Sequence, residues 1–295
     1  DNGIPTTVTH EQAGYLDVSP LDLGENARRD MVLTLEDMGM EVESSHHEKA
    51  PAQHEIDFRY GEIRRIADYI MTFRMAVRTV AKRHGLHATF MPKPRSETAG
   101  SGMHLHFSLF RQGKNIFDKT DEPGRLSDEA YYFVGGLLAH SREMALITNP
   151  LVNSYKRLVP GYGAPTELTW TENNQNSLVR IPVGRGEETR IELRSPDSAA
   201  NPYLVLAVCL AAGLDGIKNK IAPVKSANCG AENLPAENLP ETLKEAIDLF
   251  EGSSWIREVL GEDFCRQYAS AKKKEWLRYT RQVTDWEVEE YLYRL

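Results

Sequence analysis

The segment from Tyr203 to Ile217 is apolar almost all round, and this feature most limits how the chain can fold. A helix without a polar face must be surrounded by other elements, so the segment predicts an interior helix of a large domain. Asn201 is placed to cap this helix, and Pro202 suits its first turn, where a backbone N–H has no helical partner. With 295 residues, 41% of them hydrophobic, the chain can bury such a helix within one or two domains.

Two more long helices are indicated by apolar residues at helical spacing. The first covers residues 62–84, and Gly85 can end it in the left-handed conformation. The second begins after Ser127, a good N-cap, and stops at Asn149 because a proline follows. Residues 222–240 are rich in Pro, Asn and Ala and predict a loop, after which amphipathic helices are expected to the end of the sequence.

Two short segments alternate apolar and polar residues, which is typical of strands with one buried face. The first is residues 103–109, and the second is residues 189–195. One face of the first would carry His104, His106 and Ser108. One face of the second would carry Arg190, Glu192 and Arg194, with Ile191 and Leu193 on the other face.

The charge and cysteine content exclude several classes of protein. The formal net charge of -8 argues against a surface that neutralises nucleic-acid phosphates. Cys209, Cys229 and Cys265 are far apart and form neither a disulfide framework nor a zinc ribbon, so we expect a reducing compartment. No apolar run approaches the length of a membrane span, and residues 1–5 lack a signal-peptide pattern. We therefore expect a cytoplasmic protein with no nucleic-acid or membrane partner.

The sequence HHEKAPAQHE at residues 46–55 combines imidazoles with carboxylates. Hard divalent cations prefer carboxylate oxygens, and a bend in this segment would bring Glu48 and Glu55 together. The spacing does not match the His-Glu-x-x-His helix of zinc proteases. Solvated surface charge is the alternative that the segment alone leaves open.

Glycines precede the first predicted strand in GSGMH at residues 100–104. Gly100 and its neighbours permit close approach of a small ligand, and His104 and His106 could bind a metal. The segment matches neither a Walker loop nor a dinucleotide fingerprint, so a glycine-bounded hairpin with incidental histidines remains the alternative.

A basic segment runs into a Gly/Pro loop at residues 153–165. The loop could be a mobile flap above a site, with Arg157 binding an anionic substrate, or an ordinary surface connection. Arg180, Arg190 and Arg194 favour the first interpretation, since several guanidinium groups near carboxylates suit phosphoryl transfer.

Five phrases in this order resemble type I glutamine synthetase, and the resemblance covers nearly the whole chain. They are EVESSHHE (41–48), ATFMPKP (88–94), GSGMH (100–104), NSYKRLVPGY (153–162) and ANPYL (200–204). The resemblance implies an α+β fold in which a curved antiparallel sheet, backed by helices, forms part of a bifunnel site. It also implies that residues 1–295 are one catalytic domain, preceded in the family by a β-grasp domain and by a strand with two further metal-binding glutamates.

The resemblance implies an ATP-dependent carboxylate-amine ligase of glutamine biosynthesis, which joins glutamate and ammonia through γ-glutamyl phosphate. Its cofactors would be ATP and two or more Mg²⁺ or Mn²⁺ ions. The implied metal ligands are Glu48, Glu55, His104 and Glu192, and the implied catalytic residues are Arg157, Arg180 and Arg194. Substrate binding is implied for Gly100, Arg157 and Arg194, and ATP binding for His106, Ser108, Arg180 and Arg190.

Three residues depart from the family pattern on the side of the amino acid and ammonia. Gly163 stands where family members have a flap glutamate that helps to deprotonate ammonium. That role is vacant unless the carboxylate of Glu167 or Glu172 performs it. Gln175 replaces an arginine that binds phosphate and substrate, and Ala99 replaces a substrate-binding asparagine. These changes leave two alternatives open: a γ-glutamyl ligase that uses another amine, and a non-catalytic homologue that binds nucleotide or a partner.

The resemblance also implies assembly. Family members form a dodecamer of stacked hexamers, in which the amino domain of one subunit completes the site of the next. The chain as given would then supply only part of each metal site, so we expect little activity from it in isolation. The region of residues 222–240 lacks the tyrosine phrase that some members use for adenylylation, and we expect no such regulation.

Overall fold

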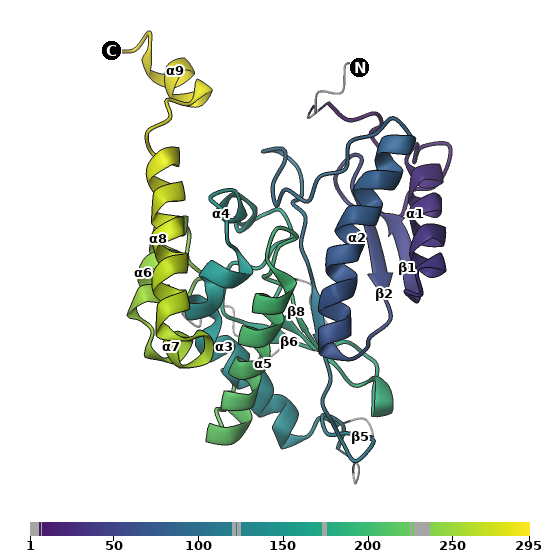
Figure 1. Cartoon of the computed structure of the whole chain (residues 1–295), viewed down its shortest axis with the longest axis vertical. Helices are drawn as coiled ribbons and strands as arrows, with labels where there is room; N and C mark the ends of the chain where they lie inside the picture. The colour runs from purple at the N-terminus through teal and green to yellow at the C-terminus, as the bar shows by residue number, and fades with distance from the viewer. Residues whose placement is uncertain are drawn as a thin grey trace.

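Helices and short strands alternate along the chain in the computed structural model, which describes residues 6, 8–119, 122, 125–172, 176–224, 226 and 237–295 (Figure 1). A β-hairpin with two helices comes first. A four-stranded sheet with two long buried helices follows, and a set of C-terminal helices comes last. The combination of helices with largely antiparallel strands confirms the expected α+β class.

The hairpin group contains α1 Glu25–Asp37, β1 Val42–His47, β2 His54–Phe58 and α2 Ile63–Arg83. β1 and β2 pair antiparallel, with His46 opposite Glu55 and His47 opposite His54. Both helices contribute to a small apolar cluster that contains Ala27, Met31 and Val77. This cluster holds the hairpin against the helices, so the turn between the strands is supported from one side.

The main sheet contains β3 Leu105–Phe107, β8 Ile191–Leu193, β7 Val179–Arg180 and β6 Trp170–Thr171, in this spatial order. β8 is antiparallel to both of its neighbours, which places Glu192 opposite His106 on one side and Arg180 on the other. β6 runs parallel to β7, so the expectation of an antiparallel sheet fails at this edge. The smaller elements beside the sheet are β4 Phe110–Arg111, β5 Lys114–Asn115 and the 3-10 turn η1 Gly186–Glu188.

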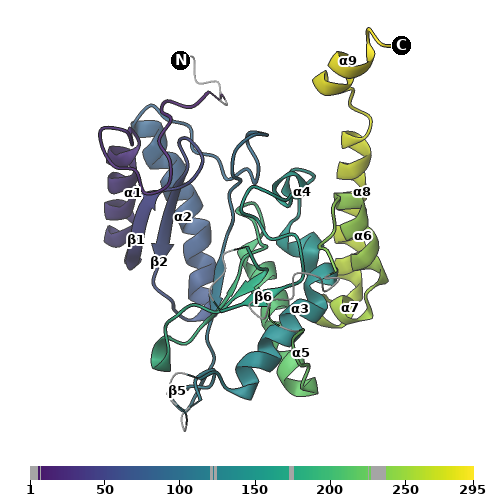
Figure 2. The ribbon, with the colours of Figure 1, turned by 180° about the vertical axis from the view of Figure 1, so that it is seen from behind.

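Two helices, α3 Asp128–Thr148 and α5 Pro202–Asn219, cross behind the sheet at very short range. A Cβ atom added at Gly136 would lie 2.1 Å from the carbonyl oxygen of Ala212, and one added at Gly216 would lie 2.1 Å from that of Tyr132. Glycine is therefore required at both positions for the two backbones to touch. Figure 2 shows this helix pair and the sheet between the hairpin group and the C-terminal helices.

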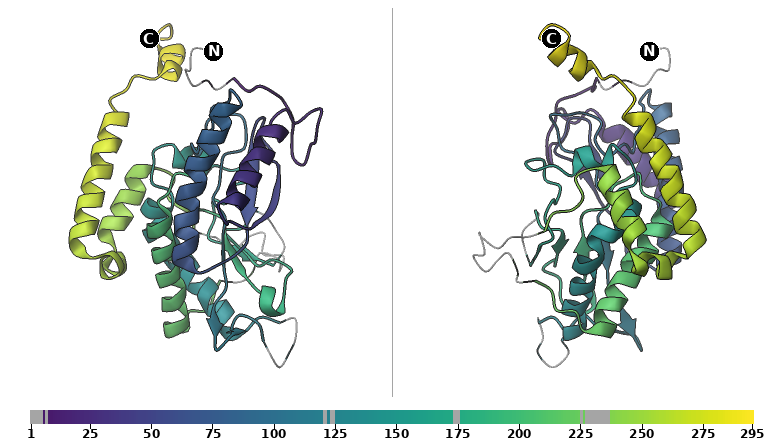
Figure 3. Two further views of the ribbon diagram at one scale, coloured as in Figure 1. Left: turned by 45° about the vertical axis from the view of Figure 1, so that its right-hand side comes forward. Right: turned by 90° about the vertical axis from the view of Figure 1, so that its left-hand side faces the viewer.

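The C-terminal part is helical, as its amphipathic pattern predicts. It contains α6 Leu243–Gly252, α7 Ser254–Leu260, α8 Glu262–Tyr279 and α9 Asp285–Tyr291, and the short α4 Ser154–Arg157 lies earlier in the chain. α6 packs between α3 and α8, whereas α9 extends beyond the end of α8 (Figure 3). No helix of the described residues is both long and apolar enough to cross a bilayer.

The predicted helix boundaries are confirmed by their caps. The Ser127 side chain accepts a hydrogen bond from the Ala130 N–H, and Asn201 accepts from the N–H groups of Tyr203 and Leu204. Gly85, which follows α2, has a φ of 72°, as a left-handed end requires. The described residues of 222–240 contain no helix or named strand, in agreement with the predicted loop.

The predicted strands over residues 103–109 and 189–195 are shorter in the structure, at Leu105–Phe107 and Ile191–Leu193. Pro196 has no N–H to donate, so the ladder cannot continue regularly beyond the end of β8. Instead, the Met103 N–H donates to the Pro196 carbonyl and Gly102 forms an isolated bridge with Asp197. The predicted facing holds, because Ile191 and Leu193 are in the core and His106 is exposed between the buried Leu105 and Phe107.

We expect Gly216→Ala to destabilise the protein strongly. The added methyl group would meet the backbone of α3, which cannot move aside like a side chain, and such overpacking costs about 1–3 kcal/mol. The free energy of unfolding, measured by denaturant titration, checks this expectation. Gly252→Ala is the matched control, since a Cβ there meets nothing within 4 Å. Equal stabilities of the two variants would contradict the close contact.

Candidate active site

One cleft, with a volume of about 2140 Å³, lies between the β1–β2 hairpin and the main sheet. Every residue predicted to bind metal, substrate or nucleotide borders it. These residues are Glu48, Glu55, Gly100, His104, His106, Ser108, Arg157, Arg180, Arg190, Glu192 and Arg194. The fold thus brings together side chains that are more than 140 positions apart in the sequence, whereas the role of each one remains a prediction.

Carboxylates gather on the hairpin wall of the cleft. The turn between the strands is closed by a hydrogen bond of 2.7 Å from the Glu48 N–H to the Gln53 carbonyl, and Glu48 and Glu55 come into side-chain contact. Burial, the contact with Glu48 and the nearby charge of Asp57 raise the pKa of Glu55 to about 9. Carboxylates crowded in this way repel one another unless a proton or a cation lies between them.

His46 and Asp57 also belong to this group, although neither was predicted as a metal ligand from the sequence. His46, Glu55 and Asp57 offer ligand atoms within 4.8 Å of one another, a spacing that a single metal ion can span. Asp57 follows Glu55 by two residues on β2, so the period of a strand could have identified it. The donor set, rich in carboxylate oxygen, fits Mg²⁺ or Mn²⁺.

Glu192 is the buried carboxyl group on the sheet wall, with 2% of its side chain exposed. Its Oε2 accepts a hydrogen bond of 2.8 Å from Arg180 Nη1, and its Oε1 accepts one from Arg194 Nη1. His104 Nδ1 lies 3.5 Å from the same Oε1. Desolvation, and then the positive charge of Arg194, hold the pKa of His104 well below its usual range, so its ring has a lone pair available for a cation.

The arginines on this wall have capacity for a further anion. The Nε atoms of Arg180 and Arg194 are buried and have no hydrogen-bond partner within the described part of the chain. Buried N–H groups without partners are costly, and a phosphate or carboxylate of a ligand would satisfy them. Arg190 lies at the rim, where its Nε donates to His106 Nδ1 over 3.2 Å.

Arg157 lies deeper than the other arginines, at 3% exposure. Its Nη1 donates to the Ser195 carbonyl over 2.7 Å and its Nη2 to the Arg194 carbonyl over 3.0 Å. Burial lowers its pKa to about 10, so it stays protonated at neutral pH. A Cβ at Gly100 would lie 2.4 Å from the Pro92 carbonyl oxygen and 2.9 Å from the Arg157 Cγ, which explains the need for glycine there. Arg157 thus supports the chain that carries Arg194.

The structure locates two of the three positions that depart from the family pattern. Ala99 and Gly163 both border the cleft, whereas Gln175 lies outside the described residues. Gly163 has a φ of 79°, and a Cβ there would be 3.7 Å from Lys49 Nζ. Neither Glu167 nor Glu172 is among the described residues that line the cleft.

We expect Glu55→Gln to remove a pH-dependent loss of stability from the metal-free protein. Because the pKa of Glu55 is raised from 4.5 to about 9, the folded protein binds this proton more tightly than the unfolded chain. Its contribution to the free energy of unfolding is present below the unfolded pKa and is lost as the pH rises toward about 9. Denaturant titrations in EDTA, at pH values from about 5 to 9, measure this loss.

Glu43→Gln is the control for this prediction, since Glu43 is an exposed carboxylate on β1, the strand paired with β2. It should follow the wild-type pH dependence, whereas Glu55→Gln should give a flatter curve. Parallel curves for wild type and Glu55→Gln would show that Glu55 does not titrate in this window.

Comparison with known proteins agrees with this geometry. Residues 2–291 match the family model described as glutamine synthetase, catalytic domain. The glutamine synthetase of Clostridium saccharobutylicum is 50% identical over 99% of this chain and 68% of its own length. That of Methanosarcina mazei is 50% identical over 99% of this chain and 67% of its own. The chain thus spans about two thirds of the length of these relatives.

Solved structures show the same architecture. A GmaS/ADP complex superimposes with a TM-score of 0.88 at 35% identity, covering 98% of this chain and 68% of that one. A cryo-EM structure of Plasmodium falciparum glutamine synthetase gives a TM-score of 0.87 at 27% identity, covering 95% of this chain and 64% of that one. The chain belongs to the glutamine synthetase family, and its match is to the catalytic domain of that family.

Proposed function

We propose that the protein is an ATP-dependent carboxylate-amine ligase that makes glutamine from glutamate and ammonia. One observation carries this proposal: a cluster of carboxylates and a cluster of arginines line the same cleft. A triphosphate with its metal ions carries both signs of charge, and a cleft with one acidic and one basic wall is suited to hold it.

The reaction would proceed in two transfers. The γ-carboxylate oxygen of glutamate attacks the terminal phosphorus of ATP, the bond to the bridging oxygen breaks, and ADP leaves. Ammonia then attacks the carbonyl carbon of the acyl phosphate, inorganic phosphate leaves, and the nitrogen loses a proton to give the amide. The charge that develops on the phosphoryl oxygens is the species that the protein has to stabilise.

The described residues suit these steps. Glu48, Glu55 and Asp57 on one wall and His104 and Glu192 on the other would hold divalent ions, which supply positive charge beside the phosphates when bound. Arg180 and Arg194 would donate to phosphoryl or carboxylate oxygen through their Nε–H groups, which have no partner among the residues that the structure describes. Arg157 would hold the Arg194 backbone in place through its two carbonyl contacts.

The remaining assignments follow the family. His106, Ser108 and Arg190 would border the nucleotide, and Gly100 would allow the amino acid to approach the backbone. We also propose a cytoplasmic homo-oligomer of stacked rings, as the resemblance to the family implies; the relatives' chains are longer than this one.

A second candidate is a γ-glutamyl ligase that uses a larger amine. The observation that favours it is the flap, where Gly163 leaves space open and the Lys49 ammonium lies nearby. A positive charge at this place would disfavour ammonium, and an open flap would admit substituents on the amine. The similarity to the GmaS/ADP complex is compatible with either candidate.

Phosphate release by the complete protein, with ATP, Mg²⁺ or Mn²⁺, glutamate and ammonium, tests the proposed function. Glutamate-dependent and ammonium-dependent release is expected, with glutamine detected as the product. Tight binding of ATP without release under any amine would instead identify a non-catalytic homologue.

We expect Arg180→Gln to lower kcat by about 10²–10³-fold, because it removes a charged donor that faces the transferring group. Steady-state phosphate release checks this. Arg111→Gln, on the exposed strand β4, is the control and should retain activity. A small change in kcat for Arg180→Gln would place this guanidinium outside the reaction.

A panel of primary amines of increasing size separates the two candidates. If ammonia is the substrate, kcat/KM falls as the amine grows, and Gly163→Glu changes this order little. If a larger amine is the substrate, its kcat/KM exceeds that of ammonium, and Gly163→Glu shifts the preference toward ammonium, because a carboxylate beside Lys49 would offset its charge.

A further inference from the structure

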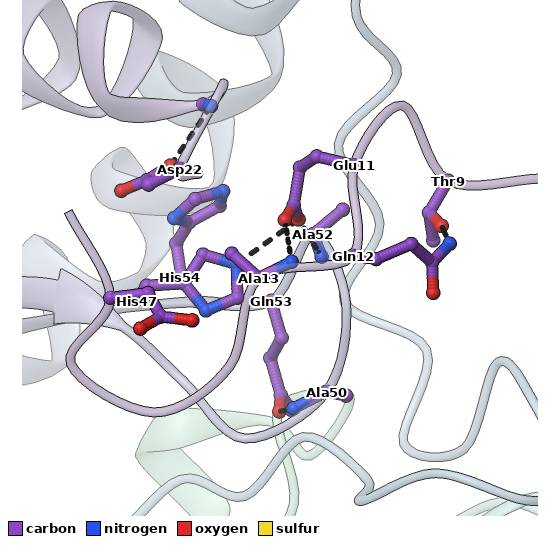
Figure 4. A network of polar contacts seen from close by, with 12 residues as sticks. Thr9, Glu11, Gln12, Ala13, Asp22, His47, Ala50, Ala52, Gln53 and His54 are labelled. Carbon is purple, nitrogen blue, oxygen red and sulfur yellow. Dashed lines mark hydrogen bonds and ion pairs between the residues drawn. The ribbon is translucent and has the colours of Figure 1, made fainter. Parts of the chain in front are cut away.

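A buried polar network lies behind the turn that connects Glu48 to Glu55 (Figure 4). Glu11, at 6% exposure, is its central carboxylate, and no role is assigned to it by the proposed reaction. Its side chain reaches the turn from the segment before α1, 36 residues or more ahead of its hairpin partners His47 and Ala52 in the sequence.

Glu11 joins three separate backbone segments. Its Oε1 lies 3.0 Å from His47 Nε2 and also accepts a hydrogen bond from the Ala52 N–H, while its Oε2 accepts from the Ala13 N–H. Burial favours the neutral acid, but the hydrogen bonds from His47, Ala13 and Ala52 outweigh it and hold the pKa of Glu11 below its ordinary value. Glu11 is therefore an ionised anchor with its lone pairs directed at the hairpin.

The two contacts with the hairpin lie at the end of its strand ladder and in its turn. His47 is paired with His54 at the end of the ladder, and its Nδ1 lies 2.6 Å from the Glu48 carbonyl. Ala52 has a φ of 55°, a left-handed conformation that is uncommon for any residue with a Cβ. The Ala52 N–H is held in this conformation by Glu11, so the carboxylate supports a strained position in the turn.

A neighbouring group, Asp22, His47 and His54, has the spacing of a metal site but is already neutralised. Arg28 Nη1 lies 2.6 Å from Asp22 Oδ2 and 2.7 Å from His54 Nδ1, so a guanidinium fills the space between them. The network behind the turn is therefore one of support and not a second cation site.

We propose that Glu11 is a positioning residue that sets the distance between the Glu48 and Glu55 carboxylates, and thereby the affinity of the site for divalent cations. This inference rests on the proposed function only in taking these carboxylates as metal ligands. Glu48 and Glu55 stand at the two ends of the turn that Glu11 holds, so a turn that relaxes lets the carboxylates separate. Partners that orient metal ligands from behind commonly change metal affinity without touching the ion.

Mn²⁺ binding to the complete protein, measured by calorimetry in the absence of nucleotide, tests the inference. We expect Glu11→Gln to weaken binding by about 10- to 100-fold. The metal concentration for half-maximal activity should rise by the same factor, with kcat recovering at saturating Mn²⁺. Glu143→Gln is the matched control, since Glu143 also accepts a hydrogen bond from a neighbour, Ser253, but far from the hairpin. It should bind Mn²⁺ as the wild type does.

The outcomes are distinct. Loss of thermal stability in Glu11→Gln with unchanged Mn²⁺ affinity would overturn the inference, as would a wild-type protein that binds no Mn²⁺ at all. If Glu11→Gln does not fold, Glu11→Asp decides: weaker Mn²⁺ binding supports the inference and wild-type affinity overturns it. Mn²⁺ binding that depends on Glu11 in a protein without ligase turnover would refute the proposed function and leave the positioning role intact.

Discussion

The contact between α3 and α5 is the constraint on which the rest of the structure depends. Gly136 and Gly216 let the two backbones approach so closely that a methyl group on either would collide with a carbonyl or an N–H. Ile191 and Leu193 of β8 are fully buried in the same apolar core as this helix pair. Because β8 is held there, the alternate residue Glu192 faces the cleft with little freedom to move.

Electrostatics then shape the two walls of the cleft. Glu192 is withdrawn from water, and Arg180 and Arg194 donate hydrogen bonds to its two oxygens. Glu55 has the opposite environment, with carboxylates for neighbours, and its pKa rises. Within the described part of the chain, one wall thus has arginine Nε–H groups without hydrogen-bond partners, and the other has several carboxylates close together. This arrangement is the complement of a metal-bound polyphosphate.

Arg157 and Glu11 hold the backbone behind these two walls through defined hydrogen bonds. Arg157 donates to the carbonyls of Arg194 and Ser195, and Glu11 accepts from two residues of the hairpin, His47 and Ala52. Both side chains are buried, and each orients a segment that carries residues predicted to bind metal or phosphate; Arg157 is itself one of the predicted catalytic residues. The accuracy of the site therefore depends on charged groups that contact backbone.

The sequence by itself determined the helices, their caps and the candidate site residues. Ser127 and Asn201 cap as expected because capping depends on local hydrogen bonds, and the phrases around Glu48, His104 and Arg157 carried the family. Only the tertiary structure decided the short length of β3 and β8, the parallel edge strand, the part played by Asp57 and the anchoring by Glu11. These features depend on which segments, distant in the sequence, pack side by side in the fold. Hydrophobic periodicity and motif spacing describe only local sequence, so they cannot predict a contact such as that of Glu11 with Ala52, 41 residues apart.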